Sequence, residues 1–411
     1  MVKRTRPHAG SLAFYPMKRA ARETPSFRSF PVVAVKDGEK GRPLNFLVYK
    51  AGMTHVLGKD LNAKGVTAGH EVAVAATVLE APPMRVFGVR AMGKAKKGFY
   101  GTGPLMDVLA GNVDKNLLRR MHSFKRKGKR AAKAGGEKKP VASIEDLEKA
   151  VSEANFSPGF LPTGKKAVLD VRLLCHSQPG KTGIGKKKPD VCEVALSGNV
   201  GQQLAFAKEK LGHELAVSEV FGEKDFVDVK AVSKGKGMQG PVKRAGVKTL
   251  RPKSKKTRVV GSIGPWHPNT IMWQVARPGQ LGYQIKTEYN KRVLKVGSSN
   301  DVGAVNQEGG FKNYGALKSD FVVLAGSVIG PSKRAIGMRV PIRPSPLGRY
   351  DLESLDYIAG TGVAAGAVAE EEVKAGHVVE KKEEKKGTKS VADEIAAAAG
   401  GGEKREKPKG N

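Results

Sequence analysis

Short apolar runs, separated by glycine and proline, dominate the hydrophobic pattern of the chain. Such runs, rich in Val and Ala, are typical of strands in an antiparallel sheet or barrel. The pattern predicts strands over residues 45–57, 70–79, 84–92, 169–175, 226–232, 271–275 and 321–329.

Apolar residues recur at helical spacing in only three places, residues 116–122, 143–154 and 203–211. In the second, Ser143 and the acids that follow it suggest a capping box, and Ile144, Leu147 and Val151 share one face. The predicted fold is therefore mainly β with α insertions (α+β). Its all-β core is an antiparallel sheet or barrel, with a long basic loop, an N-terminal extension and a disordered C-terminal tail.

Six segments follow from these patterns. The predicted core comprises residues 45–100 and 168–345, with 229–290 as a long loop. A basic extension (1–44) precedes it, and a basic helical insertion (101–167) interrupts it. A C-terminal arm (346–369) and a charge-balanced tail (370–411), which has ten acidic and ten basic residues, follow it.

The net charge of the chain indicates what kind of partner it binds. The 411 residues include 73 Lys+Arg and 39 Asp+Glu, a net charge of +34. So large an excess favours a polyanionic partner. Nucleic acid is a better candidate than a membrane, because we find neither an amphipathic basic helix nor a run of about 18 apolar residues. The two cysteines, Cys175 and Cys192, form no CxxC pair, so we expect small buried apolar residues in a reducing compartment.

The excess charge is concentrated. Residues 229–287 contain no Asp or Glu among 59 residues, but thirteen Lys or Arg. A solvated face usually mixes signs, so this stretch indicates a partner that supplies the negative charge. Trp266 lies between Pro265 and Pro268, where it either stacks on an unpaired base or covers the core. Trp273, inside the predicted strand 271–275, is expected in the core.

Two glycine patterns suggest nucleotide binding, and their surroundings argue against it. Residues 180–187 nearly match the phosphate loop, but Lys187 replaces the hydroxyl that would hold Mg²⁺, and Pro189 follows where a helix should begin. Residues 235–240 read GxGxxG, but Pro241 follows directly, and no acid appears before Glu288. The histidines form no recognisable metal or nucleophile motif. We therefore expect no enzyme activity, cofactor, metal or small-molecule substrate.

Two alternatives remain: an RNA-modifying enzyme, which would need a cofactor site, and a nucleic-acid packaging protein. Packaging proteins carry their charge in tails, whereas the longest acid-free stretch here is internal. Prolines at 7, 16, 25 and 31 disfavour a transit peptide at the N-terminus, so we expect a cytoplasmic protein.

Several separated motifs resemble the large-subunit ribosomal protein three family, in its archaeal form. They lie at residues 8–20, 45–54, 176–178, 232–240, 263–268 and 309–315, within a resemblance that covers roughly residues 3–345. The resemblance implies a barrel on the outer face of the subunit. It also implies a loop and an N-terminal extension that reach rRNA near the peptidyl transferase centre, with Trp266 at the loop tip. Where eukaryotic members carry a histidine that can be methylated, this sequence has Ser254.

The expected function is that of a structural constituent of the large ribosomal subunit, supporting assembly and translation, with large-subunit rRNA and neighbouring ribosomal proteins as partners. The expected RNA-binding residues combine the basic extension and the loop. They are Lys3, Arg4, Arg6, His8, Lys18, Arg19, Lys234, Lys236, Lys243, Arg244, Lys248, Arg251, Lys253, Lys255, Lys256, Arg258, Trp266 and His267.

Overall fold

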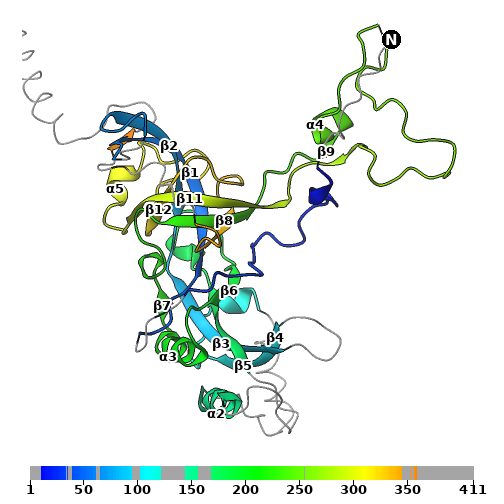
Figure 1. Cartoon of the computed structure of the whole chain (residues 1–411). Helices are drawn as coiled ribbons and strands as arrows, with labels where there is room; N and C mark the ends of the chain where they lie inside the picture. Colours follow the sequence, from blue (N-terminus) through cyan, green and yellow to red (C-terminus); the bar gives the residue numbers. More distant parts are fainter. Residues whose placement is uncertain are drawn as a thin grey trace, which may run out of the picture.

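A computed structural model describes residues 11–33, 35, 39–61, 65–94, 102–121, 144–155, 168–253, 255–344, 352 and 356–358. Within them the chain forms two large antiparallel sheets, a few short helices and one long projecting arm that carries a two-stranded sheet (Figure 1). The fold is mainly β, as predicted. The predictions for residues 1–10, for residues 122–143 of the basic insertion and for the tail 370–411 lie outside the described residues.

The larger sheet closes on itself through its hydrogen bonds. Its strands are β1 (Asn45–Lys59), β2 (Glu71–Glu80), β8 (Phe226–Val232), β11 (Ile285–Gly297), β12 (Phe321–Ala325), β13 (Ala335–Arg339) and β14 (Asp356–Ile358). Their order is β13-β8-β11-β12-β2-β1-β14, and β1 also pairs with β13. Six strands therefore form a ring of pairings, from which β14 extends.

The smaller sheet has the order β4-β3-β5-β6, from Thr102–Leu109, Met84–Lys94, Val168–His176 and Val191–Ala195, and β7 (Glu214–Leu215) pairs with β3. Helices α2 (Ile144–Asn155) and α3 (Val200–Lys210) pack beside it. The α3 residue Gln203 lies in the core, where its Oε1 accepts from the Val171 amide at 2.8 Å. Buried polar groups need such partners, so this bond fixes α3 on β5.

One hydrophobic core joins the two sheets. The first seven residues of β1 are all buried, so both faces of the strand are covered there. Phe46 of β1 and Leu173 of β5 belong to the same buried cluster. Asn45 adds a polar link, donating to the Glu193 carbonyl at 2.9 Å and accepting from the Ala195 amide at 3.0 Å.

The remaining elements are short. The 3-10 turns are η1 (Leu12–Phe14), η2 (Leu117–Arg119), η3 (Pro179–Lys181) and η4 (Val217–Glu219). Two short strands, β9 (Met238–Gln239) and β10 (Gly279–Gln280), and the helix α4 (Pro241–Ala245) lie in the projecting arm, and α5 (Val302–Val305) follows the ring strand β11.

Two predicted elements were wrong, and the bounds of two others differ from the prediction. Residues 271–275 form bends and turns, because in the arm they have no partner strand, and Trp273 is 62% exposed instead of lying in the core. Of the helix predicted over residues 116–122, the described part (116–121) contains only the 3-10 turn η2. The strand predicted over 321–329 ends at Ala325, before Gly326 with φ 77°. Helix α3 ends one residue before the prediction.

Candidate nucleic-acid interface

The acid-free segment is a projecting arm whose base is a two-stranded ribbon. Strands β8 and β11 continue beyond the ring: the Ser233 amide donates to the Gln284 carbonyl at 2.9 Å, and the Lys236 amide donates to the Leu281 carbonyl at 3.0 Å. Strands β9 and β10 prolong the ribbon. Gly282, at φ +74°, could not carry a side chain, because a Cβ would lie 2.1 Å from the Lys234 carbonyl oxygen. We call residues 233–240 and 279–284 the stalk.

Helix α4 closes the end of the stalk. Pro241 occupies its first turn, and Gly246, in the left-handed region at φ +69°, ends it. The Arg244 guanidinium donates to the carbonyls of Arg277 and Gln280, both at 3.0 Å, so it ties the helix to the returning strand. Arg244, expected to bind RNA, is half-buried and is already hydrogen-bonded within the arm.

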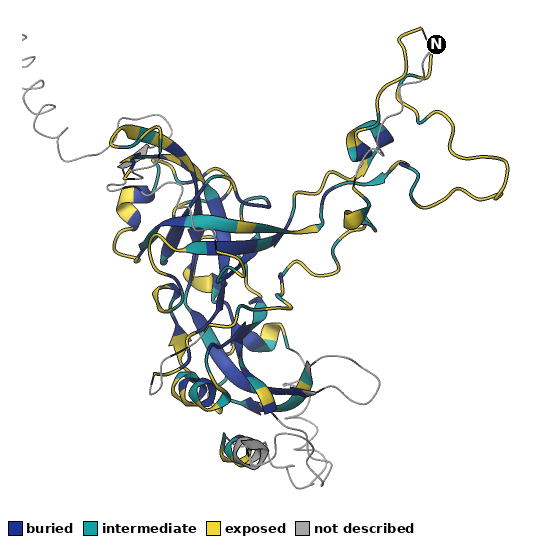
Figure 2. Cartoon of the chain, in the orientation of Figure 1, coloured by how far each residue is buried: buried dark blue, intermediate teal, exposed yellow. Residues whose placement is uncertain are grey.

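Beyond α4, residues 247–278 form an open loop that is almost entirely exposed (Figure 2). Trp266 is 88% exposed, which removes the core alternative for this side chain. The other arm cations that were predicted to bind RNA are exposed and form no ion pair with any residue that the structure describes. They are Lys234, Lys236, Lys243, Lys248, Arg251, Lys253, Lys255, Lys256 and Arg258. His267 is exposed beside Trp266.

The N-terminal segment lies along the arm, which brings the two predicted basic regions together (Figure 1). The Ala20 amide donates to the Tyr283 carbonyl at 2.8 Å, and the Tyr283 hydroxyl donates to Glu23 Oε1 at 2.7 Å. The rings of Tyr15 and Trp273 meet edge to face at 5.8 Å. Lys18, adjacent in sequence to these contacts, is exposed.

Arg19 is exposed beside it, whereas Lys3, Arg4, Arg6 and His8 lie outside the described residues. The structure thus brings Lys18 and Arg19 next to the arm.

Sequence reasoning missed the side chains that hold this arrangement. The hydrogen bond to Glu23 raises the pKa of the Tyr283 hydroxyl, and Arg334 also reaches Glu23 at 3.2 Å. Glu23 is the only acid in the first thirty residues, which was the available signal. Lys230 donates to the Ser26 carbonyl at 2.6 Å, and burial lowers its pKa.

A buried ion pair anchors the segment further along. Arg339 contacts Asp228 at 2.6 Å and donates to the Ser29 carbonyl at 2.7 Å. Its guanidinium also lies 4.8 Å from the centre of the Phe27 ring. The N-terminal segment is therefore fixed to the ring at one end and to the stalk at the other.

The two glycine patterns have no nucleotide-binding geometry. Residues 180–187 form η3 and bends, and strand β6 follows instead of a helix. Residues 235–240 lead into α4, so Pro241 begins a helix where we expected none, but that helix has only five residues. No group of three or more His, Cys, Asp or Glu among the described residues could hold a metal ion. No described helix is long and apolar enough to cross a membrane.

The fold and this surface define a structural protein with exposed, unpaired cations on an arm, which suits a polyanion. Comparison with known proteins then gives the family: the model described as ribosomal protein L3 matches residues 1–366. The chain is 41% identical to the large ribosomal subunit protein uL3 of Methanocaldococcus jannaschii, covering 87% of this chain and 97% of the relative. It is also 41% identical to that of Archaeoglobus fulgidus, covering 88% and 98%.

The chain therefore belongs to the ribosomal protein L3 family, in its archaeal form. It is a structural ribosomal protein and not an enzyme. The family match confirms the resemblance found in the sequence and extends it from residue 345 to residue 366.

Proposed function

We propose that the arm and the N-terminal segment bind large-subunit rRNA through Lys/Arg–phosphate contacts, and so support assembly and translation. One observation carries this proposal: nine exposed arm cations have no ion-pair partner among the described residues. Like charges this close repel one another unless a polyanion neutralises them. Each phosphate they neutralise releases condensed counterions, which drives binding.

The finer assignments rest on the family. We propose that the ring of strands serves as the closed barrel on the outer face of the subunit, beside neighbouring ribosomal proteins, in the cytoplasm. The arm, residues 229–290, would reach toward the peptidyl transferase centre with Trp266 and His267 near its tip. Residues 1–44 and 101–167 would add further rRNA contacts, residues 346–369 would form a C-terminal arm, and residues 370–411 would be a tail without a required role.

Sedimentation of native lysates tests the proposal. The wild-type chain should cofractionate with large subunits, and replacing Lys248, Arg251 and Lys255 with Gln should leave a larger unbound fraction at moderate salt. Replacing the exposed residues Lys59 of β1 and Lys312 and Lys318 of the connection before β12 with Gln removes the same charge away from the arm and should have less effect. Equal release of both variants would overturn the assignment of binding to the arm.

A further inference from the structure

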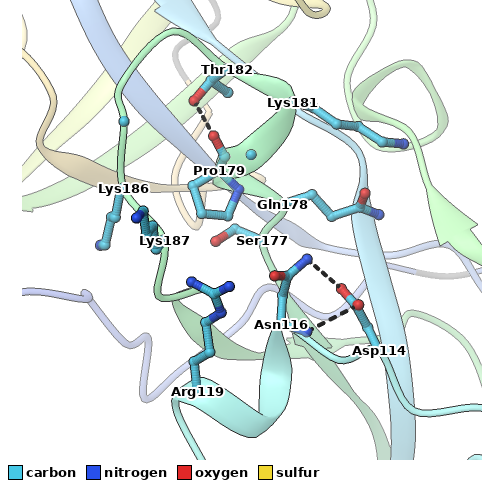
Figure 3. Close-up of a pocket in the computed structure, with 12 residues that line it drawn as sticks. Asp114, Asn116, Arg119, Ser177, Gln178, Pro179, Lys181, Thr182, Lys186 and Lys187 are labelled. Atoms are coloured by element: carbon cyan, nitrogen blue, oxygen red, sulfur yellow. Dashed lines mark hydrogen bonds between the residues drawn. The ribbon is translucent and has the colours of Figure 1, made fainter.

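A surface pocket of about 540 Å³ lies between η2 and the residues 177–187 that follow β5 (Figure 3). It is lined by four basic side chains and a single carboxylate, Asp114. This pocket is separate from the arm. Its size is within the range of about 300–1,000 Å³ typical of ligand pockets.

The floor of the pocket is a fixed polar network. The Tyr49 hydroxyl donates to Asp190 Oδ2 at 2.8 Å and lies 2.7 Å from Ser177 Oγ. Ser177 Oγ in turn accepts from the Asp190 amide at 3.0 Å. Lys186 forms an ion pair with Asp190, so its charge is already compensated inside the protein. A network satisfied in this way holds the pocket in one shape.

Two more lining charges are also engaged. Lys181 contacts Glu214 at 2.9 Å. The Asp114 carboxylate accepts from the Asn116 amide at 3.1 Å, at the start of η2. The charge of Lys181 is therefore compensated within the protein, whereas Asp114 keeps its negative charge at the η2 side of the pocket.

Arg119 and Lys187 remain. Both are exposed, and neither forms an ion pair with any residue in the described part of the chain. In Figure 3 the Arg119 guanidinium points from η2 toward Ser177 and Pro179, and Lys187 lies beside Lys186 on the other segment that lines the pocket. Two uncompensated cations that share one pocket attract an anion.

Two glycines, Gly180 and Gly185, are among the residues that line the pocket. A Cβ added at either would meet nothing within 4 Å. A polyanion's backbone could therefore approach closely here. A nucleoside triphosphate fits less well, because Lys186 is paired with Asp190 and β6, not a helix, follows this segment.

The pocket adjoins the N-terminal segment that runs to the arm. Thr24 Oγ1 donates to Asp190 Oδ1 at 3.1 Å, beneath the pocket, while the preceding residue Glu23 accepts from Tyr283 in the stalk. Two consecutive residues thus connect the pocket floor to the stalk. An RNA strand that follows the N-terminal segment from the arm would pass the mouth of the pocket.

We propose that this pocket seats a phosphodiester of large-subunit rRNA, with Arg119 and Lys187 as its cationic ligands. The proposal rests on the proposed function, since it takes the same rRNA as partner, and it adds a second contact site away from the arm.

Two charge-matched pairs of substitutions test it in the full-length chain, with a large-subunit rRNA transcript as the probe. Arg119→Gln with Lys187→Gln should weaken binding roughly tenfold, as expected when charge-assisted contacts are lost. The magnitude of the salt slope should fall by about 1, for one phosphate. The control replaces the exposed neighbours Arg120 and Lys188, which do not line the pocket, with Gln. It should bind nearly as the wild type does.

Equal losses in both pairs, or none in either, would overturn the pocket assignment while wild-type binding upholds the proposed function. Failure of the wild type to bind the transcript would overturn both. A calorimetric titration of the free protein with inorganic phosphate and with ATP distinguishes the source of the phosphate. We expect no saturable binding of either; micromolar ATP binding that is lost in the pocket pair would overturn the RNA assignment.

Discussion

For Trp266 the sequence left two positions open, stacking on an unpaired base or covering the core. In a core position, replacement by Ala would cost about 3–5 kcal/mol of unfolding free energy. At 88% exposure in the arm loop, Trp266→Ala should leave the melting temperature of the free protein nearly unchanged. The loss should appear in ribosomes, as slower translation, because stacking on an unpaired base is worth about 1–3 kcal/mol. A large drop in melting temperature with normal translation would contradict the assignment.

His176 gives the chain a pH-dependent stability. Its side chain is buried at the end of β5; Nδ1 lies 3.1 Å from the Ser177 carbonyl, and Nε2 has no hydrogen-bond partner among the described residues. Burial lowers the pKa of this imidazole. As pH falls below about 6.5, His176 therefore takes up a proton in the unfolded chain before it does so in the folded one. The free energy of unfolding is unaffected by His176 above that pH and decreases below it.

His176→Gln should remove that dependence. Between about pH 7.5 and pH 5.5 the melting temperature of the wild type should fall more than that of the variant. Parallel falls would show that other groups control acid stability.

At the scale of elements, the exposed cations on α4 and in the loop beyond it supply the charge of the outer part of the arm. Lys243, Lys248 and Arg251 are exposed and unpaired among the described residues, so replacing all three with Gln should lower the magnitude of the salt slope of rRNA binding by roughly 2, at ~0.7–0.9 per contact. An unchanged slope would mean that these side chains do not touch phosphate.

Arg244 should behave differently from those three. Arg244→Lys keeps the charge but loses the planar fork that reaches the carbonyls of Arg277 and Gln280. Binding should weaken because α4 is no longer tied to the returning strand, while the salt slope stays as in the wild type. A reduced slope would indicate that Arg244 itself contacts phosphate.

The elements also show which features a sequence can predict. Residues 45–57 and 84–92 were recognised as strands because their apolar runs fill a core. Strand β11 was missed because Ile285–Gly297 mixes charged and apolar residues, and its place is set by pairing with β8 and β12. Residues 271–275 have the composition of a strand but no partner in the arm.

For the interface, the missing carboxylates of residues 229–287 were enough to predict an exposed cationic loop. The same reasoning could not distinguish Arg244, which is bonded inside the arm, from its exposed neighbour Lys243. Nor could it pair Glu23 with Tyr283, which are 260 residues apart in the sequence. Contacts over such separations depend on the ring bringing both segments to one place.

At the scale of the whole molecule, the net charge of +34 lies entirely outside residues 370–411, which hold ten acidic and ten basic residues. These residues also contain no aromatic side chain. Deleting them should leave folding and incorporation into large subunits intact, because they add neither net charge nor apolar bulk. Quantitative mass spectrometry of purified subunits checks this, and loss of incorporation would assign a docking role to the deleted residues.

If this ribosomal protein binds rRNA through its arm and N-terminal segment, both should lie against RNA in the assembled subunit. Ultraviolet cross-linking of purified large subunits, followed by mass spectrometry of RNA-bound peptides, tests it most directly. We expect the cross-links to be concentrated in residues 11–30 and 233–284, including the peptide that carries Trp266. Cross-links confined to the ring strands, with none in either segment, would contradict it.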